Sequence, residues 1–195
     1  MEDEAAGLLV DLYYSAFEKT GVITRSVCFK NQSGQKLKLE KMLSMSVDIR
    51  EDDFDVLTLY GAHNNERNMD RRPLTSGCVQ TESLRGTSSP QQSPFMALLR
   101  KGADERQGEV FAASFVYSGN FTALAQVDPF RNVRFQMGMN PWNGQWLLEP
   151  GETFWTPEAV MVYSAQGLGG MSRTFHRFYQ RHLVRGKFAN EERPV

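Results

Sequence analysis

Hydrophobic and polar residues alternate along most of the chain, with the period of two that is expected of β-strands. The first alternating run covers residues 8–16 and the next covers residues 23–29. Between them lies the segment Glu18-Lys19-Thr20-Gly21. A short glycine-containing segment between two alternating runs predicts a β-hairpin.

Three later runs show the same alternation. Apolar residues hold one face of a long strand predicted over residues 37–49, with Lys41 as the single exception. The other runs cover residues 111–117 and 133–139. Short polar or glycine-bearing turns separate the runs, and no helical pattern lies between them. The pattern therefore predicts antiparallel pairing, either in a sandwich or in a large curved sheet.

A helical period begins only near the end of the chain, from Gly170 to about Val184. One face of this predicted helix carries Met171, Phe175, Phe178 and His182. A second face carries Arg173, Arg177 and Arg181. Arginines at this spacing are typical of the solvated side of a helix, so we expect this face to meet water or a partner rather than the core.

Size and charge narrow the class of protein. A chain of 195 residues is long enough for one well-buried core, and a net charge of −1 argues against duplex nucleic acid as the main partner. No apolar run approaches the roughly 18 to 20 residues that span a bilayer. The opening MEDEAAGLLVDLYY is acidic where a secretory signal would be basic. We therefore expect a cytoplasmic protein that binds neither nucleic acid nor membrane.

Metal and redox chemistry find little support in the sequence. Cys28 and Cys78 have no ligand spacing between them, and we expect both to be reduced thiols. His63, His176 and His182 do not follow the i, i+4 spacing of zinc ligands on a helix. We expect no metal site.

Nucleotide and serine-nucleophile sites are equally unsupported. The run Gly167-Leu168-Gly169-Gly170 precedes the predicted helix but lacks the lysine of a phosphate-binding loop. Ser76-Gly77 and Ser118-Gly119 lack the glycine pattern of a nucleophile elbow. We expect no cofactor.

The most charged segment is YGAHNNERNMDRRPL, residues 60–74, which we expect to form a loop. Glu66 and Asp70 would share one face if the segment were helical. The interleaved arginines would keep both carboxylates ionised, and an acid/base pair would then lack its proton donor. The residues favour an arginine–carboxylate network that fixes the loop over a catalytic pair.

Three tryptophans lie close together in the sequence, and sugar rings stack on such aromatic faces. Trp146 and Trp155 are predicted to pack in the core. Trp142 follows Asn140-Pro141, which places it in a turn and predicts an exposed ring.

Several long runs resemble one family. They are RRPL (71–74), ESLRGTSSPQQSPFMALL (82–99), QGEVFAASFVYSGNF (107–121), WLLEPGETFWTPEAVMVYSAQGLGGMSRTFHRFY (146–179) and RGKFANEERPV (185–195). In order and spacing they resemble the bacterial α-galactosidases of glycoside hydrolase family 36, from about Tyr13 to the end of the chain. The run at 88–92 departs from the family's Ser-Ser-His-Gln-Gln by carrying Pro90 in place of the histidine.

The resemblance implies an all-β fold, an antiparallel β-supersandwich with a C-terminal α-helix and linker. Residues 1–165 would be a partial N-terminal supersandwich domain. Residues 166–195 would be a helix and linker that lead toward a (β/α)8 catalytic barrel absent from this chain. The family's retaining mechanism uses two barrel aspartates, one in a Lys-Trp-Asp run that does not occur here. We therefore expect no catalytic residue in this chain, and no activity from it alone.

The resemblance also gives the charged segment a role. Gly61-Ala62-His63 stands where the family has Gly-Ala-Trp, in a loop that borders the galactose pocket, and Glu66 and Arg67 follow in register. His63, Glu66 and Arg67 would then bind the α-galactoside, of melibiose or raffinose type, by orienting it. His63 can hydrogen-bond a hydroxyl but offers less stacking area than an indole. The intact enzyme would be a homo-oligomer, a tetramer.

Two other hypotheses stay open on the sequence. The chain could be a free-standing carbohydrate-binding β-sandwich module that evolved without a barrel, or a purely structural interaction domain.

Overall fold

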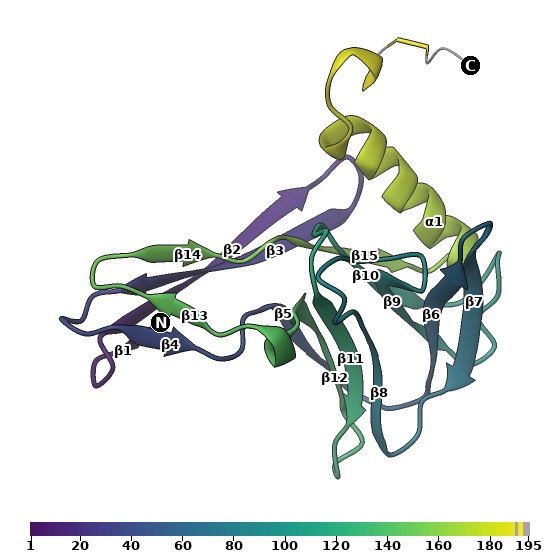
Figure 1. Cartoon of the computed structure of the whole chain (residues 1–195). Coiled ribbons are helices and arrows are strands. Elements are labelled where there is room, and N and C mark those ends of the chain that lie inside the picture. Colours follow the sequence, from purple (N-terminus) through teal and green to yellow (C-terminus); the bar gives the residue numbers. More distant parts are fainter. Residues whose placement is uncertain (190, 193–195) are drawn as a thin grey trace.

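The chain forms two packed β-sheets, a helix on the outer face of the larger sheet, and an arm of strands that projects to one side (Figure 1). This computed structural model describes residues 1–189, 191 and 192. Residue 190 and residues 193–195 of the predicted linker lie outside the described residues. No helix in the described ranges is both long enough and apolar enough to cross a lipid bilayer.

Strands make up most of the fold. Among the described residues they are β1 (Glu2–Asp3), β2 (Leu8–Phe17), β3 (Val22–Asn31), β4 (Leu37–Leu39), β5 (Leu43–Ile49), β6 (Phe54–Ala62), β7 (Asn65–Pro73), β8 (Gly77–Glu82), β9 (Gln92–Arg100), β10 (Val110–Phe115), β11 (Phe121–Val127), β12 (Val133–Met139), β13 (Trp146–Leu148), β14 (Thr153–Trp155) and β15 (Ala159–Ser164). The helices are η1 (Pro141–Asn143), α1 (Gly167–Phe178), η2 (Tyr179–Leu183) and η3 (Lys187–Ala189).

All strand pairs are antiparallel, as the turns predicted. The nine-stranded sheet has the order β1-β2-β3-β15-β10-β9-β6-β7, and β14 also pairs with β3. The four-stranded sheet has the order β5-β12-β11-β8, and β13 pairs with β4 in the arm. The predicted first hairpin is confirmed as β2 and β3, which pair from Leu8↔Asn31 to Phe17↔Val22 without a register shift.

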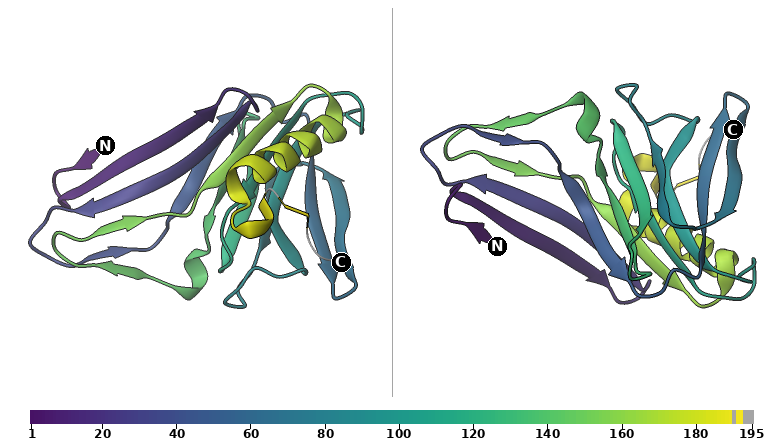
Figure 2. Two further views of the ribbon diagram at one scale, coloured as in Figure 1. Left: turned by 90° about the horizontal axis from the view of Figure 1, so that it is seen from above. Right: turned by 90° about the horizontal axis from the view of Figure 1, so that it is seen from below.

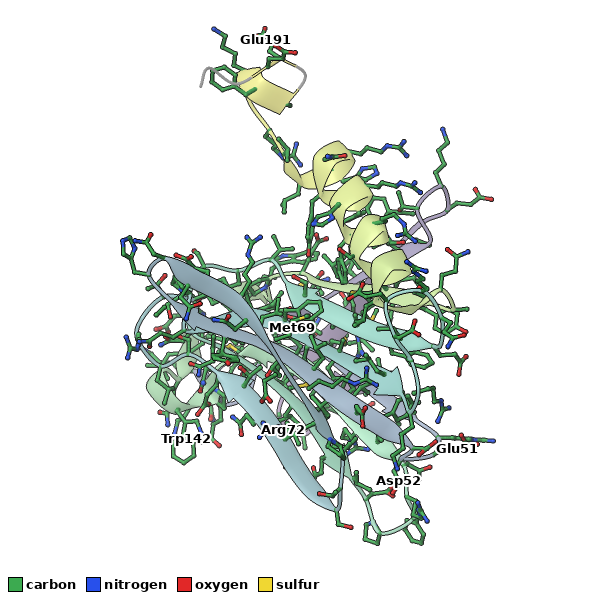
Figure 3. All side chains as sticks on the ribbon, turned by 90° about the vertical axis from the view of Figure 1, so that its right-hand side faces the viewer. Glu51, Asp52, Met69, Arg72, Trp142 and Glu191 are labelled. Atoms are coloured by element: carbon green, nitrogen blue, oxygen red, sulfur yellow. The ribbon has the colours of Figure 1, made fainter. Side chains whose placement is uncertain are left out.

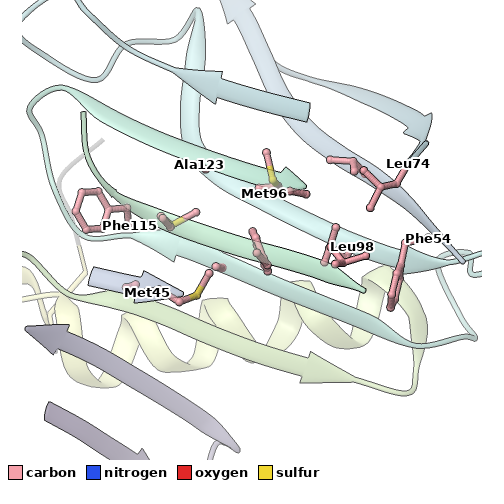
Figure 4. Packing of buried hydrophobic residues seen from close by; sticks show 14 of the residues in the cluster. Met45, Phe54, Leu74, Met96, Leu98, Phe115 and Ala123 are labelled. Carbon is pink, nitrogen blue, oxygen red and sulfur yellow. The ribbon is translucent and has the colours of Figure 1, made fainter. Parts of the chain in front are cut away.

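The main core lies between the nine-stranded and four-stranded sheets (Figure 4). Alternate residues point into it, as a half-buried strand requires. Phe54 and Val56 of β6 enter it from the nine-stranded sheet, Phe121 and Ala123 of β11 enter it from the four-stranded sheet, and all four side chains are fully buried. Burial of a large apolar side chain stabilises the fold by about 1.5–3 kcal/mol, so this layer holds the two sheets together.

The long strand predicted over residues 37–49 is wrong, because the chain forms two separate strands there. β4 belongs to the arm, where Leu39 packs with Met42 and Leu148. β5 belongs to the four-stranded sheet, where Met45 enters the main core. Residues 40–42 carry the chain from one hydrophobic cluster to the other.

Helix α1 covers the face of the nine-stranded sheet that points away from the main core (Figure 2). It begins at Gly167, earlier than the predicted Gly170, and its α-helical part ends at Phe178. Gly167 has φ +63°, and a β-carbon on it would lie 2.2 Å from the Asp104 carbonyl oxygen. Glycine is therefore required where the start of the helix approaches the turn between β9 and β10.

The predicted apolar face of the helix is confirmed over its first turns, where Met171, Phe175 and Phe178 are buried. The chain stays helical to Leu183, close to the predicted end at about Val184, but residues 179–183 wind as a π-helical turn. His182, assigned to the apolar face, is exposed there, although its ring lies 4.7 Å from that of Phe17. The three arginines on the second face are exposed, as predicted.

The predicted burial of two tryptophans is wrong. Trp146 is 44% exposed and Trp155 is 51% exposed, because they lie on outward faces of the arm strands β13 and β14. Trp155 instead packs against Tyr13 of β2, with ring centroids 4.5 Å apart. Trp142 is 77% exposed in a 3₁₀ turn, as predicted, and its amide donates to the Asn140 side chain.

Candidate functional site

Residues 60–74 form most of a β-hairpin, so the predicted loop is wrong. β6 and β7 pair from Asp55↔Pro73 to Ala62↔Asn65, and His63 and Asn64 make the turn. Asn64 has φ +62°, a conformation that asparagine tolerates better than most residues in two-residue hairpin turns. β7 is an edge strand of the sheet, and an edge strand can be polar on both faces.

A β-bulge lies just below the tip of this hairpin. Tyr60 pairs with Asn68 and Ala62 pairs with Asn65, so Gly61 alone is opposite the two residues Glu66 and Arg67. Arg67 has φ +59°, and a β-carbon on Gly61 would lie 2.3 Å from the Asn65 carbonyl oxygen. A bulge redirects side chains, and here glycine leaves the space that the extra residue needs.

The three residues predicted to bind substrate all belong to this tip, and all three are exposed. The Glu66 carboxylate accepts a hydrogen bond from the Asn64 amide at 3.1 Å, which ties the bulge to the turn. His63 lies in the turn itself, with its ring open to solvent. The tip therefore offers hydrogen-bonding groups to a neighbouring molecule.

Arg67 faces a different part of the surface. It lines a cavity of about 530 Å³ between the hairpin and helix α1, together with Met69, Phe175 and His176. Figure 3 shows this edge of the molecule, with Met69 on the side toward α1 and Arg72 farther from it. The structure thus joins His63 and Glu66 at the tip and directs Arg67 toward the helix.

The predicted arginine–carboxylate network exists in the lower part of the hairpin. Arg71 contacts Asp55 of β6 at 2.8 Å, and Arg72 lies 3.7 Å from Asp70. Glu66 is not part of this network, because its contact is the Asn64 amide. The network stabilises strands rather than a loop.

A polar groove of about 690 Å³, which the sequence pattern did not predict, lies between the two sheets. Thr58, Asp70 and Arg72 line it from the nine-stranded sheet, and Thr81 lines it from β8. The signal was present in the inward positions of β6 and β8, which change from apolar residues to threonine. Whether these threonines line one common groove depends on the strand register, which alternation alone does not give.

No three His, Cys, Asp or Glu side chains gather closely enough to hold a metal ion within the described part of the chain. Both cysteines are free, and burial raises the pKa of the Cys28 thiol. The geometry of the tip suits hydrogen bonding to hydroxyl groups.

Comparison with known proteins gives the family. Residues 1–149 match the family model described as "Glycosyl hydrolase family 36 N-terminal domain", and residues 153–195 match the model described as "Melibiase". Alpha-galactosidase AgaA of Geobacillus stearothermophilus is 55% identical over 193 residues, which are 99% of this chain and 26% of that protein. Alpha-galactosidase Mel36A of Lactobacillus acidophilus is 41% identical over 195 residues, 100% of this chain and 27% of that protein.

Solved structures agree with the sequence relatives. A variant of AgaA in complex with stachyose matches with a TM-score of 0.97 over 100% of this chain and 27% of that chain, at 55% identity. The α-galactosidase from Lactobacillus brevis matches with a TM-score of 0.97 at 42% identity, over 100% of this chain and 26% of that chain. These matches confirm the predicted resemblance and the predicted β-sandwich fold. The chain spans about a quarter of the length of these relatives.

Proposed function

This chain belongs to glycosyl hydrolase family 36, and from that membership we propose that it forms a non-catalytic N-terminal portion of an α-galactosidase. The intact enzyme would remove terminal α-linked galactose from oligosaccharides. Its retaining mechanism needs two carboxylates about 5 to 5.5 Å apart on either side of the glycosidic bond. In our proposal two aspartates of a (β/α)8 barrel supply them.

The hairpin tip is the part of this chain that would reach the sugar. The observation that carries the proposal is the bulge opposite Gly61, which fixes the backbone from which His63, Glu66 and Arg67 project. A fixed backbone suits a pocket wall, because a sugar hydroxyl is recognised best by groups that are already in place. These residues would orient the substrate and transfer no proton.

Structures of the relative AgaA contain raffinose and stachyose, which supports an α-galactoside of the raffinose type as the substrate. The proposal also includes a division of the chain after residue 165, with residues 166–195 leading from the sandwich to the barrel. The barrel would be one partner of this region, and further copies in a homotetramer would be the others.

A chimeric enzyme tests the proposal. The aligned quarter of AgaA is replaced by residues 1–195 of this chain, and galactose release from a nitrophenyl α-galactoside is measured for the chimera and for the isolated chain. We expect the chimera to be active and the isolated chain to be inactive. Release by the isolated chain at an enzyme-like rate would overturn the non-catalytic role.

Variants of the chimera test the pocket wall separately. We expect His63→Ala, Glu66→Gln and Arg67→Ala to raise KM by about tenfold each, the loss of one hydrogen bond to substrate, with a smaller change in kcat. Lys19→Ala, an exposed change in the β2–β3 turn, is the matched control and should leave both constants unchanged. If the three tip variants behave like Lys19→Ala, the tip does not form the wall.

A further inference from the structure

The polar groove between the sheets has the side chains of two threonines on its floor. Phe54, Val56 and Thr58 alternate along β6 and therefore point to the same side, into the sandwich. Thr81 follows Val79 in the same way on β8. The hydrophobic core thus ends at two inward-facing threonines.

The Thr58 side chain is 8% exposed and the Thr81 side chain is 7% exposed, and neither hydroxyl is among the fully buried atoms that lack a partner in the described part of the chain. Both hydroxyls therefore face the groove, where water can reach them. Since both side chains line the groove, a molecule bound there can replace water as the hydrogen-bond partner of both hydroxyls.

The charged groups that line the groove are the carboxylates of Asp70 and Glu82 and the guanidinium of Arg72, and each has a polar partner. Asp70 is paired across the hairpin with Thr58, and Arg72 lies 3.7 Å from the Asp70 carboxylate. The Glu82 carboxylate accepts hydrogen bonds from the amides of Gln80 and Asn140, at 2.9 and 2.8 Å. The groove therefore presents many hydrogen-bond donors and acceptors, but it offers no unpaired cationic group that would select an anion.

An aromatic ring stands at the mouth of the groove. Tyr60 is half-exposed and pairs with Gln92 of β9, and Gln91 lies beside it. An aromatic face packs against the C–H side of a sugar ring, and amide side chains donate to and accept from hydroxyls. The volume of about 690 Å³ lies in the range of small-molecule sites, about 300–1,000 Å³.

We propose that this groove binds a neutral sugar unit of an oligosaccharide. Thr58, Thr81 and Asp70 form hydrogen bonds with the hydroxyl groups of the sugar, and Tyr60 packs against its ring. The proposal goes beyond the function proposed above and uses none of His63, Glu66 and Arg67.

A competing occupant of the groove is an extended polypeptide strand. Such a strand would pair with β8, because β8 is an edge strand of the four-stranded sheet. Backbone pairing along β8 would leave the hydroxyl of Thr58, on the opposite sheet, without a partner. Hydroxyl groups that face the groove from both sheets therefore favour the sugar.

The test is titration of the 195-residue chain with raffinose and with galactose, followed by calorimetry and by amide NMR shifts. We expect saturable binding of at least one of these sugars, with shifts centred on residues 58–60, 70–72 and 80–82. Thr58→Val with Thr81→Val replaces both hydroxyls by methyl groups of nearly equal size and should weaken the affinity about tenfold or more. Asp70→Asn, at a partly exposed position, should also weaken it and does not depend on buried packing.

Two control variants test whether a loss of affinity is specific to the groove. Thr24→Val changes an equally buried threonine of β3, outside the groove, and should leave the affinity unchanged. His63→Ala should also leave it unchanged. Loss of binding in His63→Ala together with normal binding in the groove variants would assign the sugar to the hairpin tip and overturn the proposal.

Two further results would also overturn the proposal. One is no saturable binding of raffinose or galactose by the folded chain. The other is concentration-dependent self-association that shifts the β8 amides while neither sugar does, which would mark β8 as a strand-pairing edge. Activity of the chimera tests the hairpin tip and is a separate readout from all of these.

Discussion

Arg71 and Asp55 join the two strands of the β6–β7 hairpin at its base. Both Nε and Nη2 of Arg71 lie 2.8 Å from the same Asp55 carboxylate oxygen, and Nη1 donates to the Ala103 carbonyl at 2.7 Å. The two side chains are only 33% and 17% exposed. Because Ala103 belongs to the turn between β9 and β10, this contact ties the hairpin to the rest of the sheet.

Replacement of Arg71 by lysine should therefore weaken the hairpin. A lysine carries one compact charge and cannot reach Asp55 and Ala103 together in a planar fork. We expect Arg71→Lys to lower stability by about 1 kcal/mol and the melting temperature by about 2–4 °C. Thermal unfolding followed by circular dichroism measures this.

The control for Arg71 is Lys101→Ala, which breaks the pair between Lys101 and Asp53. Both of those side chains are more than half exposed, so their pair should contribute less than about 0.5 kcal/mol. Equal shifts for the two variants would mean that the Arg71 fork does not hold the hairpin.

Alternation predicted the strands that bury one face. Residues 133–139 became β12 because Val133, Phe135 and Met137 all enter the main core. The same pattern failed over residues 37–49, where apolar positions continue in phase while the chain passes from one hydrophobic cluster to another. Periodicity reports which side of a strand is apolar, and it does not report which core that side meets.

The candidate site was predictable only in part. β7 has no apolar period because it is an edge strand, so residues 60–74 read as a loop. The bulge that places Glu66 and Arg67 opposite Gly61 depends on pairing between strands. The groove likewise depends on the register that places Thr58 beside Asp70, which no local pattern reveals.

Gly61 allows a direct test of the hairpin tip. A β-carbon there would lie 2.3 Å from the Asn65 carbonyl oxygen and 2.7 Å from the Glu66 α-carbon, both of them backbone atoms. Gly61→Ala should therefore displace residues 63–67 and cost about 1–3 kcal/mol of stability. Amide NMR shifts locate the displacement, and chemical denaturation measures the cost.

Gly34→Ala is a suitable control for the tip, because a β-carbon at Gly34 meets nothing within 4 Å and its φ is not left-handed. It should leave stability within about 0.5 kcal/mol. Unchanged shifts over residues 63–67 in Gly61→Ala would show that the tip absorbs the methyl group and is not fixed by the bulge.

Phe175 anchors helix α1 on the sheet. Its side chain is buried and meets the Phe95 ring of β9 edge-on, with centroids 5.9 Å apart. Phe175→Ala should leave a cavity and cost about 3–5 kcal/mol. Urea unfolding measures the loss, with Arg177→Ala on the exposed face as the control. A cost below about 1 kcal/mol would mean that the helix is held elsewhere.

Glu109 and Tyr163 form a contact that depends on pH. The Tyr163 hydroxyl donates to the Glu109 carboxylate at 2.6 Å, and Arg100 lies 3.4 Å from it. The tyrosine hydrogen bond, followed by that arginine, lowers the pKa of Glu109. A carboxyl group whose pKa is lower in the folded state adds stability above its unfolded pKa, and this stability is lost as the pH falls through the folded pKa.

Tyr163→Phe should therefore lower the urea midpoint at pH 7, and its difference from the unchanged chain should shrink as the pH falls below about 4.3, the ordinary glutamate pKa. Tyr13→Phe is the control, because the Tyr13 ring packs against the Trp155 ring and not against a carboxylate. A Tyr163→Phe difference that stays constant from pH 7 to pH 3 would contradict the assignment.

The aromatic surface of the arm is the place where we expect copies of the chain to meet. The Tyr13 and Trp155 rings pack against each other there while half-exposed, and Leu12 and Tyr14 are exposed on the other face of β2. Residues 12–17 contain no lysine or proline, the residues that natural edge strands use to prevent pairing. The opposite edge of the same sheet, β7, is charged and ends in Pro73.

Light scattering after size exclusion, over a range of concentrations, tests this surface. The unchanged chain should self-associate, and Tyr13→Ser with Trp155→Ser should shift it toward the monomer by removing apolar area from the contact. Trp142→Ser removes a more exposed ring on a separate turn and should leave the association unchanged. Equal effects of the two changes would indicate nonspecific hydrophobic association. A monomer at every concentration would show that the arm is not a subunit contact of the isolated chain.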